Sequence, residues 1–397
     1  MKPKAGAPFS AGFAVGLALG LASVLWLGSL SDTVVRTAVP LTPEEAIIHK
    51  SATPVISTTG MQAEAVRPVG IAAVGDVQLS RRVGLRIAAS GWAPIFEGVR
   101  PLIEGADLAF CNLESPASTL GVSYAGKDPA VTFRADPASL FALKRAGFDL
   151  VSLANNHSGD FGGKALMQTL DALDALDIAS SGAGANLASA RKPALVEAAG
   201  KRIALLSYTE PMWSVTEAGQ DSGVAIIRET EIIADLVSAR GLADYVIISL
   251  HWGEEYEGVP RERDRAFARR LVDAGAAAIL GHHPHVLQGV EFHRGVPILH
   301  SLGNFVFDMI SPKTYESAIA YLRLGAEAPA SVQLIPIRID ASSFAPFRAT
   351  GRDAAAIGKL IAERCAALGT RTEILPDGAV LAIDHSPDNA RMSSSMP

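Results

Sequence analysis

The chain has 397 residues, of which 49% are hydrophobic and 19% charged, with a net charge of −6 and a mean hydropathy of +0.25. This composition excludes a disordered chain, because such chains are charge-rich and poor in apolar residues. The mild negative charge argues against a nucleic-acid partner. The two cysteines, Cys111 and Cys365, are too few for a disulfide scaffold or a thiolate zinc cluster. Length alone predicts two or three domains.

The first predicted element is a membrane anchor at residues 9–30. This run is apolar, carries no charged side chain and has the length of one transmembrane helix. Lys2 and Lys4 precede it, so the positive-inside rule leaves residues 1–8 in the cytosol and exports the rest of the chain. A cleaved signal peptide is the alternative, although no clean Ala-x-Ala site follows the run. Both interpretations place the main domain outside the cytosol.

The regions that flank the main domain carry further patterns. In the predicted anchor, small residues recur at every fourth position, at Gly12, Gly16 and Gly20. They form a flat face that permits a homodimer, although glycine is also simply common in membrane helices. Residues 31–69 contain scattered proline, serine and threonine without a sustained period, which predicts a linker. Residues 385–397 are predicted to be a disordered tail, which leaves 70–384 as one large domain.

Within this domain, short apolar runs alternate with helical patterns. The runs predicted to be strands are residues 70–74, 107–111, 149–154, 244–250 and 276–280. Apolar residues spaced three to four apart predict helices at 137–146, 163–176 and 261–274. A hairpin is predicted from the runs 290–292 and 296–300. The alternation predicts an α/β fold whose sheet strands are covered on both faces.

Each of the five predicted strands is followed by a polar side chain that can bind a metal: Asp76, Glu114, Asn156, His251, and the pair His283 and His285. Ligand sites in open α/β sheets form at the carboxyl ends of the strands. One such residue would be an ordinary loop side chain, but five strand ends in one chain favour a shared metal site. Carboxylate, amide and imidazole donors are typical of Zn, Mn or Fe. A carboxylate such as Glu114 can bridge two cations.

The motifs around these residues resemble a known family. They are GDVQLS (75–80), CNLESP (111–116), SLANNHSGDFG (152–162), SLHWGEEYE (249–257), GHHPHVLQGVE (281–291) and HSLGNFVFD (300–308). Together they closely resemble the CapA family, bacterial proteins associated with poly-γ-glutamate capsule synthesis, within the calcineurin-like metallophosphoesterase superfamily. The resemblance implies a layered sandwich of central β-sheets flanked by helices. A membrane anchor also fits that family, so we expect a single-pass protein of the bacterial cytoplasmic membrane.

The resemblance also implies roles for individual residues. The implied metal ligands are Asp76, Glu114, Asn156, His251, His283 and His285. His157 matches the proton donor beside the metals, and the alternative is that it only orients the ligands. Asp160, Asn304 and Asp308 belong to motifs particular to the family, and we expect them at the substrate edge of the site.

The chain departs from the superfamily pattern at two positions. Gln78 stands where the first motif normally has histidine, and Glu114 stands where a bridging aspartate is usual. One cation position then has Asp76, Glu114 and His285, and the other has Glu114, Asn156, His251 and His283. Because a neutral amide oxygen is a weaker ligand than imidazole, we expect one firmly held divalent cation and a second that is weak or absent.

Four further residues have open assignments. His282 is expected to pack or to orient a ligand rather than to bind a metal, and His300 could reach the site. Cys111 and Cys365 could pair in an oxidising compartment. Cys111 follows an apolar run, however, so a buried and unpaired thiol is the expectation.

Three functions remain open. The first, implied by the resemblance, is an anchored protein that makes, releases or trims a poly-γ-glutamate-like polymer by hydrolysing or transferring an amide bond. Its partners would be an extracellular anionic polymer or another cell-envelope substrate, and a membrane synthase. The second is a phosphoesterase, and the third is a non-catalytic scaffold that assists the synthase. A phosphate site usually adds Arg or Lys. Lys164 and Arg134 are the nearest candidates, so the motif loops mildly disfavour phosphate.

Overall fold

The computed structural model describes residues 67–212, 215–309, 311–325 and 331–384. The chain divides into two compact units, Met1–Glu64 and Ala65–Pro397, and the described residues all lie in the second. The predicted anchor at 9–30, the linker up to residue 66 and the tail at 385–397 lie outside the described residues. Within the described part of the chain, no helix is both long and apolar enough to cross a membrane.

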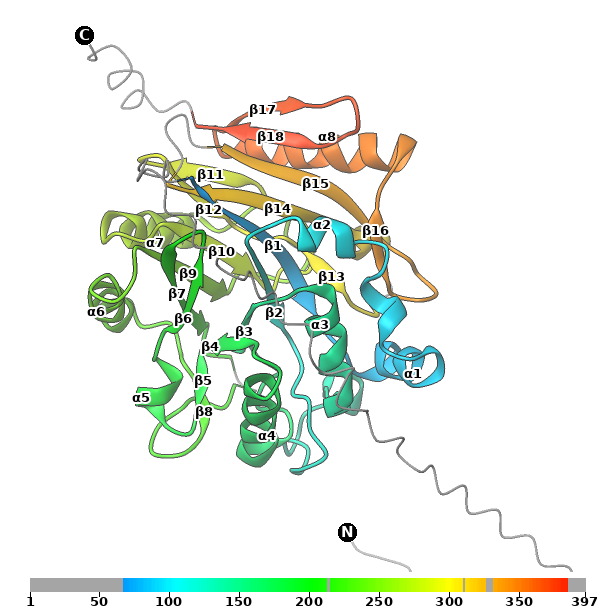
Figure 1. Ribbon diagram of the computed structural model, residues 1–397, viewed down its shortest axis with the longest axis vertical. Coiled ribbons are helices and arrows are strands. Elements are labelled where there is room, and N and C mark those ends of the chain that lie inside the picture. Colours follow the sequence, from blue (N-terminus) through cyan, green and yellow to red (C-terminus); the bar gives the residue numbers. More distant parts are fainter. Residues whose placement is uncertain (1–66, 213–214, 310, 326–330, 385–397) are drawn as a thin grey trace, which may run out of the picture. The chain divides into compact units, whose positions relative to one another are not determined.

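The larger of two main sheets has ten strands among the described residues. They are β1 (Val69–Val77), β2 (Leu108–Leu113), β3 (Leu150–Ser152), β4 (Ala179–Ser181), β13 (Asn304–Val306), β14 (Glu316–Leu324), β15 (Ser331–Ile339), β16 (Pro346–Arg348), β17 (Arg371–Ile374) and β18 (Val380–Ile383). Eight of them follow the order β17-β18-β15-β14-β1-β2-β3-β4, while β13 pairs with β1 and β16 with β15. The strands β1 to β4 are parallel, and those from β14 to β17 are antiparallel (Figure 1).

The smaller sheet is parallel at its centre. Its strands are β6 (Ala194–Ala198), β7 (Lys201–Thr209), β9 (Tyr245–His251), β10 (Ala278–His282), β11 (Val290–His293) and β12 (Val296–Leu299), in the order β11-β12-β10-β9-β7-β6. The outer strands β6 and β11 run antiparallel to their neighbours, and β11 and β12 form the predicted hairpin. Two short strands, β5 (Ala183–Gly184) and β8 (Gly223–Val224), pair separately.

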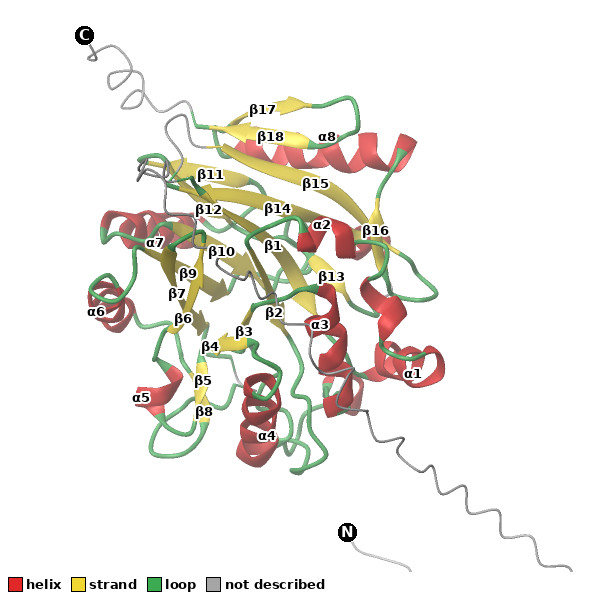
Figure 2. Ribbon diagram, in the orientation of Figure 1, coloured by secondary structure: helices red, strands yellow, loops and turns green. Residues whose placement is uncertain are grey.

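Helices cover both sheets. They are α1 (Arg81–Ser90), α2 (Arg100–Glu104), α3 (Leu140–Ala146), α4 (Gly162–Asp174), α5 (Leu187–Ala190), α6 (Glu229–Ala239), α7 (Glu262–Asp273) and α8 (Gly351–Ala367). Short 3-10 helices occur at Ala93–Phe96, Pro129–Val131, Pro137–Ser139 and Pro312–Tyr315. Figure 2 separates the helices from the strands and shows the helices around the sheets. The three predicted helices correspond to α3 with its preceding 3-10 turn, α4 and α7.

Three apolar cores define the layers. The central core joins inward-facing residues of the two sheets, such as Ile71 and Phe110 from the larger and Leu205 from the smaller. A second core fills the space between the larger sheet and the helices α3 and α4, and a third lies between the smaller sheet and the helices α6 and α7. Alternate residues of one strand therefore enter different cores, as the two-residue period of a strand requires. The predicted layered α/β arrangement is confirmed.

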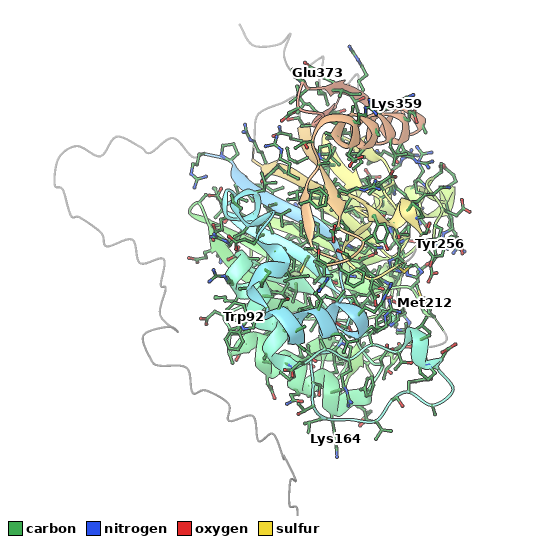
Figure 3. All side chains as sticks on the ribbon, turned by 90° about the vertical axis from the view of Figure 1, so that its right-hand side faces the viewer. Trp92, Lys164, Met212, Tyr256, Lys359 and Glu373 are labelled. Atoms are coloured by element: carbon green, nitrogen blue, oxygen red, sulfur yellow. The ribbon has the colours of Figure 1, made fainter. Side chains whose placement is uncertain are left out.

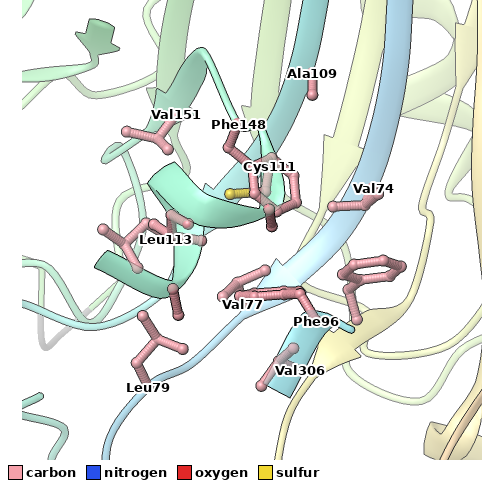
Figure 4. Close-up of a cluster of buried hydrophobic side chains, with 14 of the residues drawn as sticks. Val74, Val77, Leu79, Phe96, Ala109, Cys111, Leu113, Phe148, Val151 and Val306 are labelled. Carbon is pink, nitrogen blue, oxygen red and sulfur yellow. The ribbon is translucent and has the colours of Figure 1, made fainter. Parts of the chain in front are cut away.

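The two cysteines lie in different cores, and both are free thiols. Cys111, in β2, lies near Phe148, Val74 and Leu113 in the core beside the helices (Figure 4). Cys365 belongs to α8 and accepts a hydrogen bond at Sγ from the Val290 backbone N–H. Burial raises the pKa of both thiols. Both side chains therefore act as small apolar residues, and a disulfide between them is excluded in this fold.

Two glycines allow the strand ends to approach the loop before β13. A Cβ atom on Gly75 would lie 1.9 Å from the Gly303 carbonyl oxygen, and one on Gly281 would lie 2.0 Å from the His300 carbonyl oxygen. The Asp76 N–H donates to the same Gly303 oxygen at 3.0 Å. The backbone of this loop therefore lies directly against the end of β1, next to Asp76.

Replacing Gly75 with alanine tests this close approach. The added methyl group would overlap a backbone carbonyl that cannot move without shifting β13, so we expect Gly75→Ala to lower the free energy of unfolding by about 1–3 kcal/mol or more. The measurement is urea-induced unfolding of the full chain. Gly219→Ala is the matched control, because a Cβ there meets no atom within 4 Å. Equal unfolding midpoints for the two variants would contradict the prediction.

Candidate metal centre

The sequence-predicted ligands come from one end of both main sheets. Asp76 lies in β1, Glu114 follows β2, and Asn156 lies in the loop after β3. His251 is the last residue of β9, and the loop that carries His283 and His285 follows β10. Because β1, β2 and β3 are parallel and so are β9 and β10, their carboxyl ends lie at common edges. The sequence predicts that Asp76 and His251 follow their strands, whereas in the structure both residues belong to the strands, β1 and β9.

Two overlapping groups of three side chains could hold a cation among the described residues. The first consists of Asp76, Glu114 and His285, all buried, with ligand atoms within 4.8 Å of one another. This group is the set that the sequence predicts for the first cation position. The second consists of Glu255, His283 and His285. Sequence reasoning missed Glu255, although it lies in the HWGEE motif.

The remaining predicted ligands adjoin the first group. Asn156 Oδ1 lies 2.9 Å from His251 Nε2, and Glu114 Oε1 lies 3.9 Å from the same nitrogen. The ring centroids of His251 and His283 are 4.8 Å apart, and those of His283 and His285 are 5.8 Å apart. The structure thus brings the six candidate ligands together around Glu114, while their function as ligands stays a prediction.

Asn112 connects three of these side chains. Its Nδ2 group lies 2.9 Å from Asp76 Oδ1, 3.3 Å from His251 Nδ1 and 3.4 Å from Glu114 Oε2. Asn155 in turn donates to Asn112 Oδ1 at 3.1 Å. The sequence carried a signal for Asn112, because it is a polar residue inside an apolar strand and faces the same side as Glu114 two residues later.

Asn304 contacts the candidate ligand His285 through its side-chain amide. Its Oδ1 lies 2.8 Å from His285 Nδ1, and its Nδ2 donates to the Thr314 carbonyl oxygen at 3.2 Å. Because Nδ1 of His285 donates to Asn304, its lone pair is at Nε2, which lies 3.8 Å from Glu114 Oε1. The contacts of Asn304 are those of a residue that orients a metal-binding imidazole.

The two other histidines near these motifs have different surroundings. His282 is buried, with Nδ1 3.2 Å from Asp76 Oδ1, and its ring packs against Phe110 at 5.6 Å between centroids. His300 bonds Glu291 at 3.1 Å and stacks on Trp252, so it does not reach the candidate ligands. The possibility that His300 joins the site is therefore wrong.

His283 and His285 have unusual backbone conformations. Their φ angles are 95° and 58°, in the left-handed region that non-glycine residues rarely adopt. Each such residue costs on the order of 1–3 kcal/mol, which the surrounding packing must offset. Pro284 lies between them and fixes the turn. The turn is held against the site by the His283 N–H, which donates to Asp76 Oδ2 at 3.3 Å.

Charge is unevenly distributed in the cluster. Burial raises the pKa of the Asp76 carboxyl, but its contacts with His282 and His285 outweigh burial and hold that pKa well below its usual range. Burial and the Asp76 charge raise the pKa of Glu114 well above its usual range. Burial lowers the pKa of His285, whereas Glu114 and Asp76 raise it, with a net value of about 9. At neutral pH His285 therefore carries a proton and a positive charge, beside the ionised Asp76.

The other two imidazoles are neutral. Burial and the nearby His285 lower the pKa of His283 to about 3. Burial and His283 lower the pKa of His251 well below its usual value. A neutral imidazole has one ring nitrogen with a free lone pair, which is the form that binds metals.

Several buried polar atoms of the cluster have no hydrogen-bond partner in the described part of the protein: Glu114 Oε1, both ring nitrogens of His282, and His283 Nδ1. A buried polar atom without a partner costs about 1–3 kcal/mol. A carboxylate oxygen and imidazole nitrogens are donors that suit Zn, Mn or Fe. The residues present therefore fit a divalent cation held through Glu114 and its neighbours.

His157 lies beside the candidate ligands within a second polar group. Its Nδ1 is 2.9 Å from Asp160 Oδ2 and 3.2 Å from Lys127 Nζ, and Lys127 also donates to Asp160. The ring stacks on Phe133 at 3.8 Å, and its Nε2 lies 3.8 Å from Glu114 Oε1. Asp160 thus orients His157. Sequence reasoning missed Lys127, which is 30 residues away in the chain.

Basic residues also line a cavity next to the site. Arg81, Arg82, Tyr256 and Asp308 are among the residues around this cavity, whose volume is about 460 Å³. Both arginines pair with Asp308, which is buried. The Arg81 guanidinium lies 4.4 Å above the Phe133 ring. The cavity therefore adjoins the His157 group and has a net positive charge, since two arginines face one carboxylate.

The expectation that the nearest basic residues would be Lys164 and Arg134 is wrong. Lys164 is exposed in α4 and lies well away from Tyr256 (Figure 3). Arg134 is exposed and stacks on Phe161. Arg81 and Lys127 are closer to the site, and neither lies in a motif loop that ends in a candidate ligand.

Gln78 is buried, and its side-chain amide lies 2.8 Å from Ser80 Oγ. The amide at the position where the superfamily motif has histidine is therefore engaged in a hydrogen bond with Ser80.

The fold and the site together define a layered α/β protein with a candidate divalent-metal centre at the carboxyl ends of its parallel strands. Residues 70–309 match the family described as "Bacterial capsule synthesis protein PGA_cap". The chain belongs to this family of CapA-like proteins, which its motifs also indicate.

Two relatives and one solved structure illustrate the similarity. The chain is 32% identical over 306 residues to the capsule biosynthesis protein CapA of Bacillus anthracis, covering 74% of each chain. It is 32% identical over 277 residues to the PGA biosynthesis protein CapA of Bacillus subtilis (strain 168), covering 69% of this chain and 73% of that one. The structure of an NAD nucleotidase from Haemophilus influenzae superposes with a TM-score of 0.41 at 11% identity, over 74% of this chain and 62% of that one.

Cation uptake should release protons. Because His285, with a pKa of about 9, retains a proton in the absence of a cation, a cation must displace it, and metal binding requires the deprotonated ligand. We expect the affinity for Zn²⁺ to rise with pH by about tenfold per unit for each proton displaced, and to level off near the His285 pKa of about 9. Calorimetric titration at pH 6, 7, 8 and 9 in buffers of different ionisation enthalpy measures the Zn²⁺ affinity and the number of protons released on binding. An affinity that does not change over this range would contradict the prediction.

Proposed function

We propose that this chain is a membrane-anchored, metal-dependent hydrolase or transferase that acts on amide bonds of an extracellular anionic polymer. The observation that carries the proposal is the convergence of Asp76, Glu114 and His285 within 4.8 Å, with His157 beside them. The relatives named for capsule and PGA biosynthesis support a polymer of the poly-γ-glutamate type. The predicted anchor at residues 9–30 supports a location outside the cytosol.

The candidate ligands would hold one or two cations through Glu114. When bound, a divalent cation polarises the substrate carbonyl and lowers the pKa of a nearby water to about 7. We expect Asp76, Glu114 and His285 to hold the weaker cation, because Gln78 supplies no imidazole at that position. The firmer cation would be held by Glu114, Asn156, His251 and His283. The metal would be Zn, Mn or Fe, as the donor set favours.

His157 would move the proton. The short contact with Asp160 assigns the ring proton to Nδ1, so the lone pair of Nε2 faces the candidate ligands. Burial and the Lys127 charge lower the pKa of His157 well below its usual value, so the ring is neutral before the reaction. The ring can accept the proton of the attacking water at Nε2 and then donate it to the departing amine. The predicted proton donor thus first acts as an acceptor.

Asp160 and Asp308 have different surroundings in this scheme. Asp160 is buried behind His157, where burial raises its pKa to about 6 although Lys127 and the Phe133 N–H lower it. It orients His157 and would balance the charge of the protonated ring. Asp308 lines the cavity, so the predicted place at the substrate edge fits Asp308 better than Asp160 or Asn304.

The positively charged cavity supports an anionic substrate. Arg82 is half exposed on its wall, and the Arg81 guanidinium lies over Phe133. A polymer with a free carboxylate on each residue could place one carboxylate here while an amide bond lies at the ligands. Arg81 and Arg82 thus supply the basic side chains that the motif loops lack.

A phosphoesterase is the second candidate. The same observation favours it, since guanidinium groups bind phosphate as well as carboxylate. The two candidates differ in the bond that is broken, not in the charge of the substrate. Substrate turnover therefore has to separate them.

The membrane partners remain proposals. A homodimer through Gly12, Gly16 and Gly20 and an association with a membrane synthase would both place the domain near the growing polymer. Copurification of a synthase with the full-length chain would support the association.

An activity panel tests the function. The purified full-length chain is loaded with Zn, Mn or Fe in turn and offered γ-glutamyl oligomers, peptidoglycan fragments and a generic phosphodiester. Release of amines from γ-glutamyl oligomers supports the proposal. Turnover of the phosphodiester alone would assign the second candidate, and no turnover with the cation bound would favour a scaffold.

Replacing His157 tests its role. We expect His157→Ala to lower kcat by roughly two to four orders of magnitude, the usual scale for general acid–base catalysis, while the bound cation content stays unchanged. The hairpin residue His293, which pairs with Asp273 away from the site, provides the control variant His293→Ala with unchanged kcat. Full turnover by His157→Ala with the cation retained would remove His157 from the mechanism.

A further inference from the structure

Glu255 is the one member of the two candidate groups that no strand-end pattern predicts. It lies in the loop after β9, exposed to solvent, between the two exposed acids Glu254 and Glu257. One of its carboxylate oxygens lies within 4.8 Å of ring nitrogens of both His283 and His285. An exposed acid near two histidines is common, so the question is whether the fold holds Glu255 in this place.

The loop that carries Glu255 is fixed to the histidine turn on both sides. The Tyr256 N–H donates to the Pro284 carbonyl oxygen at 2.8 Å, and the Trp252 N–H donates to the His282 carbonyl oxygen at 3.1 Å. These two backbone bonds align the loop with the turn that contains His283 and His285. Glu255 therefore faces the two imidazoles because of main-chain pairing and not through a flexible side chain alone.

Further contacts hold the same loop from outside. The Gly253 N–H donates to Glu210 at 3.0 Å, and the Glu257 carbonyl oxygen accepts a bond from Gln288 at 2.8 Å. Glu254 pairs with Arg261 at 3.0 Å. Two adjacent acids thus have different surroundings: Glu254 has a guanidinium, and Glu255 has two imidazoles and the Tyr256 hydroxyl.

His283 provides an independent sign of a ligand. It is 94% buried, its left-handed φ of 95° carries strain, and its Nδ1 has no hydrogen-bond partner among the described residues. A buried ring nitrogen of this kind is costly unless a cation or a donor occupies the space next to it. A Glu255 carboxylate oxygen lies within 4.8 Å of a ring nitrogen of the same His283.

We propose that Glu255 is an additional metal ligand, which with His283 and His285 forms an outer position for a divalent cation such as Zn²⁺ or Mn²⁺. The inference rests on the proposed use of a cation at this site and identifies a ligand that the motif pattern does not assign. Since a neutral His285 has one free lone pair, the outer position and the position of Asp76 and Glu114 compete for it. The outer position also competes for His283 with the position of Glu114, Asn156 and His251. A cation at the outer position is therefore weakly bound, and Glu255 controls how strongly it binds.

The outer position lies beside the substrate cavity. Tyr256, next to Glu255, lines the cavity and lies at the surface of the protein (Figure 3). Its ring centroid is 6.4 Å from that of His285. A cation at Glu255 would therefore be reachable by the anionic group of a substrate in the cavity, which links the second cation to substrate binding.

Cation binding by the full-length chain tests the inference. After chelation, Zn²⁺ binding is measured by calorimetry and by metal analysis after equilibrium dialysis, and the coordination is followed by the visible spectrum of the Co²⁺-loaded protein. Glu255→Gln removes the charge but keeps the size of the side chain. The matched control is Glu254→Gln, which changes the neighbouring acid that pairs with Arg261.

The expected result is a loss in one class of sites. Glu255→Gln should lower the Zn²⁺ affinity of the weaker class of sites by at least about 10-fold, which is the lower end of the effect of residues that only orient ligands. If the unchanged chain has a single class of sites, the affinity of that class should fall by the same factor. The Co²⁺ spectrum should change with it, while Glu254→Gln should match the unchanged chain. Identical isotherms and spectra for Glu255→Gln and the unchanged chain would overturn the inference, as would the absence of any cation binding.

The result is independent of catalysis. A chain that loses a cation class in Glu255→Gln but turns over no substrate supports the ligand and removes the proposed activity. A chain that hydrolyses γ-glutamyl oligomers but binds cations identically in Glu255→Gln keeps the activity and removes the ligand.

Discussion

The structure depends on two carboxylates that are completely buried at the ends of neighbouring parallel strands. Asp76 and Glu114 have no exposed surface, and taking such charges out of water is costly unless opposite charge or hydrogen bonds compensate. The nearby side chains meet this requirement in part. Asn112 donates to both carboxylates and the protonated His285 lies beside Asp76, but Glu114 Oε1 has no hydrogen-bond partner among the described residues. A divalent cation would meet the same requirement with two positive charges.

The fold supplies these compensating groups from both sheets. The larger sheet provides the carboxylates, while the smaller sheet provides His251 and the turn that carries His283 and His285. The central core holds the two sheets face to face, so the ends of β1 and β10 meet at one edge. Glycines at positions 75 and 281 remove the side chains that would keep the β13 loop away. A precise cluster of polar groups thus depends on apolar packing several residues distant.

A second group of residues surrounds the site without joining it. Lys127 and Asp160 fix the His157 ring, and Arg81 extends this polar group toward the cavity through its contact with Phe133. Arg81 and Arg82 outnumber Asp308 in the wall of the cavity, whereas Asp76 and Glu114 are completely buried. Such a separation of charge would direct an anionic substrate toward the candidate cation.

The sequence by itself determined the strands and the polar residues that follow them, because the two-residue strand period and the turn residues are local properties of the chain. It also carried the motifs that indicate the family. Only the tertiary structure decided which acidic side chains lie near His285 and which positively charged side chains lie near His157. Arg81 and Asp308 are 227 residues apart, and Lys127 and Asp160 are 33 apart. No local period records such pairs, since they meet only when the parallel strands β13, β1, β2 and β3 of the larger sheet end at one edge.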